Sequence, residues 1–169
     1  RDHFLGVLFP SDELTILPYH RVLHDAAPEE VAALLDGLSF SYEIEAAENV
    51  FVPTESAMFG LAFRDKHYKL TKRQDVEALA VATLQRDILE PYFRVEDVRT
   101  DERIDFVGGK DAIERLEALA RRQDVVILTC HATAMEELMR VADEAGQMPP
   151  KSTWFEPKLK SGLFIHRFD

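Results

Sequence analysis

Residues 148–163 hold the side chains best suited to chemistry, because cations and hydroxyl groups occur there on a restrained backbone. These sixteen residues include three prolines, three lysines and three hydroxyl side chains, in a chain whose formal net charge is −11. Lys151, Ser152 and Thr153 are consecutive and offer an ammonium and two hydroxyls to a phosphate or a carboxylate. Lys158 adds a second ammonium. We therefore predict an anion-binding loop.

The prolines of this segment favour a rigid loop. Pro149, Pro150 and Pro157 fix φ and remove backbone donors, which excludes a helix or a central strand. Preset angles also reduce the entropy lost when a ligand binds. The segment lacks the glycine run of a P-loop. Trp154 and Phe155 are predicted to anchor the loop on the core. The alternative is a rigid loop that closes the last strand and leaves its lysines in water.

A second candidate lies at residues 17–21, Leu-Pro-Tyr-His-Arg. His20 and Arg21 follow a predicted strand end, where they could present a proton carrier and an anion clamp. The alternative is a surface pair that caps a hairpin. His20 and His24 have the i, i+4 spacing of helical metal ligands, but no third ligand is in register, so we expect no metal site. Cys130 follows an apolar strand and is interpreted as a small core residue.

Composition limits the class of protein. The 169 residues are enough for one domain with a sizeable core, and we expect residues 1–169 to form it. The net charge disfavours binding to nucleic acid or to an anionic membrane surface. No apolar run approaches the roughly 18 residues of a membrane span. The single cysteine excludes an internal disulfide and fits a reducing cytoplasm, which is the expected location.

The spacing of apolar residues predicts an α+β fold with a mixed, largely antiparallel sheet and helices packed on it. The first two predicted strands should pair as a hairpin, as should the fourth and fifth. Strands are predicted at 4–9, 14–17, 39–45, 58–63, 67–70, 104–107, 125–128 and 163–168, and helices at 28–38, 74–90, 110–122 and 134–145.

The segment Met-Pro-Pro-Lys-Ser-Thr-Trp-Phe-Glu-Pro-Lys at 148–158, with Ser-Gly-Leu at 161–163, resembles the C-terminal signature of the bacterial and archaeal family called domain of unknown function 1015. That signature usually has tyrosine where this chain has Trp154. Residues 14–21 are similar to the family's Leu-Pro-Thr-His-Arg element, with Tyr19 replacing threonine. Residues 76–89 resemble its Asp-Val-x-x-Leu-His helix, with Gln85 where histidine is common. Residues 104–108 and 124–145 also fit.

The resemblance implies that this chain is the C-terminal half of a longer protein. Family members carry an N-terminal Ala-Asp-Gly-His-His-Arg element that resembles the phosphate-handling signature of the ParB and sulfiredoxin superfamily, whose relatives include free-serine kinases. That element is absent here. The resemblance thus implies nucleotide-dependent chemistry, with a nucleotide and Mg held in the intact protein mainly by the missing half.

Two functions follow as expectations, and whether the chain is an enzyme stays open. In the first, it is the substrate- and anion-binding half of a nucleotide-dependent phosphotransferase for a small molecule, similar to a serine kinase. The residues expected to form its site are His20, which would position or move a proton, and Arg21, Lys151, Ser152, Thr153 and Lys158, which would surround the anion. In the alternative, it is a non-catalytic structural or regulatory module that docks on the N-terminal half.

Overall fold

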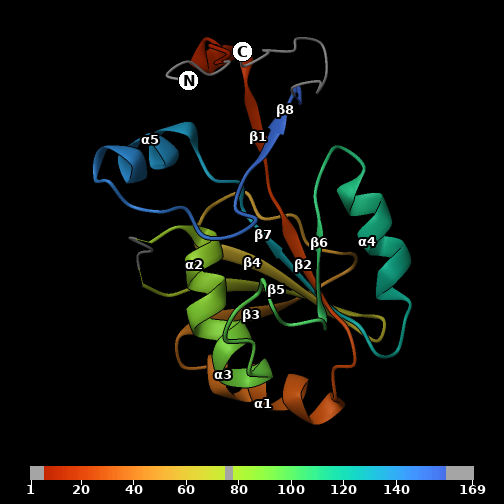
Figure 1. Cartoon of the computed structure of the whole chain (residues 1–169). Coiled ribbons are helices and arrows are strands. Elements are labelled where there is room, and N and C mark those ends of the chain that lie inside the picture. The colour runs from red at the N-terminus through yellow and green to blue at the C-terminus, as the bar shows by residue number, and fades with distance from the viewer. Residues whose placement is uncertain (1–5, 75–77, 159–169) are drawn as a thin grey trace.

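A six-stranded antiparallel sheet forms the centre of the molecule, in the strand order β3-β5-β4-β7-β2-β6 (Figure 1). The computed structural model describes residues 6–74 and 78–158. Each pair of neighbouring strands in this sheet is antiparallel. The strands are β2 (His20–Leu23), β3 (Tyr42–Ala47), β4 (Met58–Phe63), β5 (Lys66–Lys72), β6 (Ile104–Val107) and β7 (Val126–Cys130).

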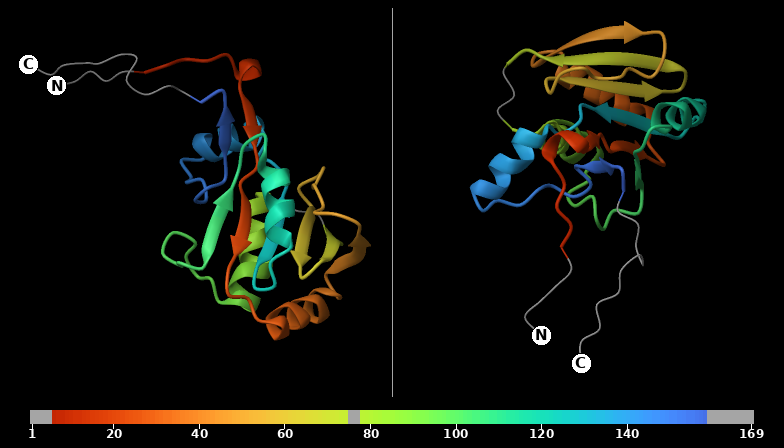
Figure 2. Two further views of the ribbon diagram at one scale, coloured as in Figure 1. Left: turned by 90° about the vertical axis from the view of Figure 1, so that its right-hand side faces the viewer. Right: turned by 90° about the horizontal axis from the view of Figure 1, so that it is seen from above.

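Helices cover the sheet on both faces and create two separate cores (Figure 2). One face packs against α1 (Pro28–Leu38) and against a continuous helical segment made of α2 (Ala80–Leu84), a π-helical stretch (Gln85–Leu89) and α3 (Glu90–Phe93). The other face packs against α4 (Ala112–Ala120). Side chains alternate between the faces of a strand, so neighbouring residues of β2 enter different cores: Leu23 joins the first and Val22 the second.

A two-stranded ribbon projects from one end of the large sheet (Figure 1). It pairs β1 (Thr15–Leu17) antiparallel with β8 (Trp154–Glu156), with Thr15 opposite Glu156 and Leu17 opposite Trp154. A short 3₁₀ helix (Ser11–Glu13) precedes β1, and α5 (Met135–Asp143) lies beside the ribbon without a fully buried residue. The ribbon therefore brings the proline-rich segment next to the start of β2.

The predicted α+β class is confirmed, and most predicted elements lie within a few residues of the observed ones. The expected hairpin between residues 4–9 and 14–17 is wrong, because β1 pairs with β8 and residues 6–10 form no strand. The sequence did not predict β8, because the prolines on both sides of it favoured a loop. The predicted helix at 74–90 begins later, at Ala80. The predicted strand at 163–168 lies outside the described residues, as do residues 4 and 5.

Asp87 ties the helical segment to the edge of the sheet. Its carboxylate accepts a hydrogen bond from the Tyr42 hydroxyl (2.7 Å) and pairs with Lys72 (2.5 Å) and Arg86 (2.7 Å). Burial alone would raise the pKa of Asp87, but the hydrogen bonds from Arg86, Lys72 and Tyr42 lower it to about 2. The side chain is only 14% exposed, so solvent screens these contacts little.

Replacing Asp87 by asparagine is expected to lower the free energy of unfolding by about 2 kcal/mol at pH 7. Because the folded-state pKa lies below the ordinary 3.8, this contribution is complete above pH 4 and is lost as the pH falls toward 2. Urea denaturation at pH 7 and at pH 3 measures it. The difference between the wild type and Asp87→Asn should narrow at pH 3, whereas the exposed control Asp36→Asn should show no difference at either pH.

Candidate anion-binding site

Arg21 is the central side chain of the candidate site. It lies in β2 opposite Phe106 of β6, and its guanidinium sits 5.3 Å from the centre of the Phe106 ring. One terminal nitrogen donates to the Tyr19 carbonyl, and the other donates to the Pro150 carbonyl at 3.2 Å. Arg21 is only 3% exposed. The residue therefore joins the first strand of the large sheet to the proline-rich segment.

The charge of Arg21 is not balanced by the described part of the chain. Its Nε is buried and has no hydrogen-bond partner there, and no carboxylate of residues 6–74 and 78–158 pairs with it. Burial lowers the pKa of Arg21, but a guanidinium stays protonated in proteins. Buried charges are normally paired or hydrogen-bonded, so this guanidinium is suited to receive an external anion.

Two adjoining clefts open beside this guanidinium. The first, of about 440 Å³, is lined by Arg21 and by residues of the helical segment and of two loops. The second, of about 450 Å³, is lined by Lys151 and Phe106 among others. Both clefts share Val98, Arg99 and Pro150. The clefts are therefore neighbours, and their linings together contain three cationic residues, Arg21, Arg99 and Lys151, and three acidic ones, Glu96, Asp97 and Asp101.

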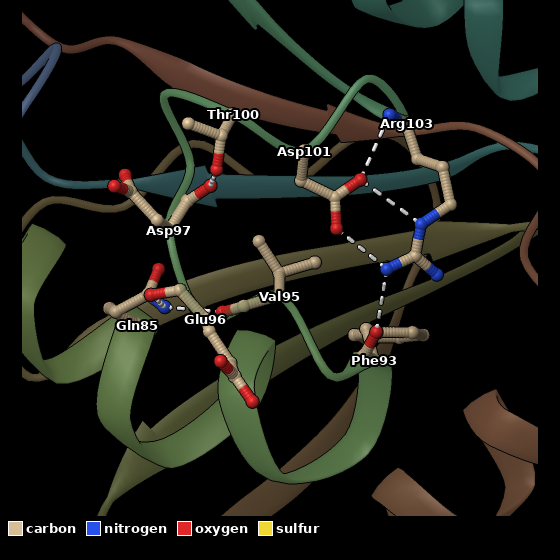
Figure 3. Close-up of polar contacts among 8 residues, drawn as sticks. All are labelled: Gln85, Phe93, Val95, Glu96, Asp97, Thr100, Asp101 and Arg103. Carbon is tan, nitrogen blue, oxygen red and sulfur yellow. Dashed lines mark hydrogen bonds and ion pairs between the residues drawn. The ribbon is translucent and has the colours of Figure 1, made fainter.

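The loop between α3 and β6 forms one wall of both clefts, and its own polar contacts hold it in place (Figure 3). Arg103 pairs with Asp101 at 2.7 Å and donates to the Phe93 carbonyl at 3.0 Å. Gln85 of the π-helical stretch donates to the Val95 carbonyl at 2.6 Å. π-Helical turns occur often at functional sites, and here Gln85, the first residue of that stretch, is among the residues that line the first cleft.

The predicted site residues of the proline-rich segment fall into three environments. Lys151 is exposed, has a left-handed backbone (φ 51°) and lines the second cleft. Ser152 is buried, and its carbonyl accepts a hydrogen bond from the Thr133 hydroxyl at 3.2 Å. Thr153 and Lys158 line a different hollow beside the ribbon. The structure thus brings Lys151 to the Arg21 site and separates Thr153 and Lys158 from it.

His20 points to the other face of β2 from Arg21 and is 2% exposed. Its Nδ1 accepts a hydrogen bond from the backbone N–H of Cys130 at 3.3 Å. Burial, and secondly the charge of Arg21, lower the pKa of His20 to about 4. The imidazole is therefore neutral at pH 7, and it is not among the side chains that line either cleft. Its observed contact holds the end of β7 in place.

Arg99 is a cleft residue that the sequence prediction missed. It is exposed, and its guanidinium donates three hydrogen bonds to the Asp97 carboxylate, the shortest at 2.7 Å. Nothing in the sequence distinguishes an arginine two residues from an aspartate from an ordinary surface pair. Gln85 was noticed only because it replaces a histidine in the resembled pattern. No motif indicated that either side chain would lie beside Arg21.

The chain belongs to the family described as Protein of unknown function (DUF1015), which matches residues 1–100. No curated protein matches it in sequence. Among solved structures, a mutant free serine kinase in complex with AMP superposes with a TM-score of 0.51 at 15% identity. A mutant free serine kinase in complex with ADP superposes with a TM-score of 0.50 at 17% identity.

In both comparisons the match covers 86% of this chain and 55% of the kinase chain. At this level of identity the likeness shows the fold. The chain spans little more than half the length of these kinases, so their activity can enter only as a proposal. Helices that could cross a membrane are not found in the described part of the chain. The similarity to the ParB and sulfiredoxin superfamily stays a prediction.

Proposed function

We propose that this chain is the part of a nucleotide-dependent phosphotransferase that binds the anionic group of a small substrate. The observation that carries the proposal is Arg21, a buried guanidinium at a cleft, whose Nε has no partner and which forms no ion pair within the described residues. Glu96 and Asp97 line the same cleft without pairing with it. The fold shared with free serine kinases that were solved with AMP and ADP supports the reaction class.

In this proposal the three cations have different tasks. Arg21 is fixed by two carbonyl groups and offers a preorganised donor to a phosphate or carboxylate oxygen. Lys151 and Arg99 are the exposed cations of the clefts. Lys151 adds positive charge near the transferred group, whereas Arg99 is already paired with Asp97 and offers its remaining donor capacity. Such charge stabilises the oxygens of a phosphoryl group most when the donors do not need to reorganise. His20 acts as a positioning residue through the backbone of Cys130.

A bound nucleotide with Mg would supply the phosphoryl group and neutralise its charge. The described residues contain no group of three His, Cys, Asp or Glu side chains that could hold a metal ion. We therefore assign no step in this chain to the metal. The nucleotide is proposed to bind mainly to the portion that the longer kinases have and this chain lacks. This chain is then one domain of a longer protein.

The proposal predicts that Arg21→Met weakens the binding of inorganic phosphate and of O-phosphoserine by about 100-fold, because the variant keeps the bulk and removes the buried charge. Isothermal titration calorimetry at low salt measures both affinities. Lys151→Gln should weaken binding less, by about fivefold, because its ammonium is exposed. The exposed control Lys66→Gln should have no effect. Undiminished binding by Arg21→Met would remove this cleft from the site.

The alternative, a non-catalytic docking module, has one observation in its favour. Val7, Leu8 and Phe9 are exposed apolar residues in a row, and Leu8 is 98% exposed. Such a row is unfavourable in water and suits a surface that another protein segment covers. This function predicts that the 169-residue chain self-associates on its own and that Leu8→Ser restores a monomer. Light scattering after size-exclusion chromatography, with and without phosphate, separates this function from the first.

A further inference from the structure

A concave apolar hollow lies where the two-stranded ribbon meets the large sheet. Its volume is about 430 Å³, which is within the range of small-molecule sites. It is separate from the two clefts at Arg21, since none of its lining residues lines either of them. The walls are mostly apolar or aromatic, with two hydroxyls, on Tyr19 and Thr153, and one ammonium: Val7, Phe9, Leu14, Tyr19, Thr153, Trp154, Phe155, Pro157 and Lys158.

A row of three aromatic rings leads from the second cleft to this hollow. Tyr19 packs edge-on against Phe106, with 6.4 Å between ring centres, and against Trp154, with 5.2 Å. Each ring carries a cation: Arg21 over Phe106 at 5.3 Å, Lys151 over Tyr19 at 5.6 Å, and Lys158 over Trp154 at 3.2 Å. Positive charge is therefore distributed along the whole row.

Lys158 lacks a counterion at the hollow. Its ammonium lies against the indole face of Trp154, and it forms no ion pair within residues 6–74 and 78–158. The nearest acidic residue along the strand, Glu156, instead accepts a hydrogen bond from the Trp154 indole nitrogen at 2.9 Å. Lys158 is exposed, and the absence of a carboxylate partner there leaves its ammonium available to an external anion at the rim of the hollow.

Gly108 keeps the hollow in shape. A Cβ atom at this position would lie 2.6 Å from Cε3 of Trp154 and 3.1 Å from Cδ1 of Tyr19. The backbone at the end of β6 can therefore approach both rings only because it has no side chain there. The backbone at Gly108 therefore packs directly against the rings of Trp154 and Tyr19 and restricts their positions.

We propose that this hollow binds a small organic phosphate with a flat aromatic ring. The ring lies against the apolar and aromatic walls, and the phosphate pairs with Lys158 at the rim. Apolar walls with few polar groups are typical of sites that orient a ligand by one charged contact. The proposal does not rest on the function proposed above, because it uses different residues and a different cavity.

The test uses phenyl phosphate as the probe and Trp154 as the reporter, since it is the single tryptophan of the chain. Phenyl phosphate should change the tryptophan emission in a saturable way and bind at least about tenfold more tightly than phenol, which lacks the charge. Inorganic phosphate, which lacks the ring, should leave the emission unchanged. Lys158→Gln should weaken phenyl phosphate binding by about tenfold, because one charge-assisted contact is lost.

Arg21→Met is the comparison variant, because it removes the charge of the first cleft and none of the side chains that line the hollow, although Arg21 also donates to the backbone carbonyl of Tyr19, a lining residue. The emission response to phenyl phosphate should persist in Arg21→Met. If it is lost there, or if Lys158→Gln responds like the wild type, the ligand binds elsewhere and the inference is wrong. Equal affinity for phenol and phenyl phosphate would also overturn it. Failure of the Arg21 proposal alone would appear as unaltered phosphate calorimetry in Arg21→Met, with the emission results unaffected.

Discussion

Acidification from pH 6.5 to pH 4 is expected to cost the wild-type protein about 3 kcal/mol of folding free energy through His20 alone. The ordinary pKa of histidine is 6.5, and burial together with Arg21 lowers that of His20 to about 4. The unfolded chain therefore takes up a proton first as the pH falls. Stability is complete above pH 6.5 and declines until the folded state is also protonated near pH 4.

Protonation of His20 also breaks a specific contact, which makes the effect assignable. The Nδ1 atom accepts from the Cys130 N–H, and a protonated ring can no longer accept. His20→Gln can keep an acceptor and does not titrate, so its stability should stay flat between pH 6.5 and pH 4. Urea denaturation at several pH values measures both proteins. His24→Gln serves as the control, and a wild-type profile as flat as that of His20→Gln would contradict the lowered pKa.

The sequence predicted the fold better than it predicted the pairing of strands. Helix α1 and the β4–β5 hairpin follow from local patterns, namely apolar spacing after Pro28 and a polar turn between apolar runs. Strand β8 does not, because its pairing with β1 joins segments at opposite ends of the chain. A single sequence carries no signal for such a pairing, and the prolines on both sides of β8 argued for a loop.

The candidate site shows the same division. The types of His20, Arg21 and Lys151 indicated an anion site, and the structure does place Arg21 against the Pro150 carbonyl. His20 and Arg21 are adjacent residues of a strand, so their side chains face opposite sides of the sheet and do not share one site. The role of Arg99 depends on a loop whose course is set by hydrogen bonds to carbonyl groups (Figure 3). Such contacts leave no pattern in the sequence.

Arg21→Met is expected to leave the free energy of unfolding unchanged or to raise it by up to about 2 kcal/mol. A buried guanidinium must be stripped of water, and within the described residues it receives no carboxylate in return. Methionine has a similar length and needs no partner. The Tyr19 and Pro150 carbonyls lose a donor, but Pro150 is exposed and can bond to water, so the loss there is small.

This expectation separates a functional arginine from a structural one. If Arg21 mainly braces the proline-rich segment, then removal of its two hydrogen bonds should destabilise the protein by more than about 2 kcal/mol. If it is kept for an anion, the same variant should be as stable as the wild type while phosphate affinity falls. Denaturation by guanidinium chloride in the absence of phosphate measures the free energy of unfolding of each variant. Arg21→Ala, which also leaves a cavity, should be less stable than Arg21→Met. A buried charge that lowers the stability of the free protein but increases its affinity for an anion is typical of a residue kept for binding.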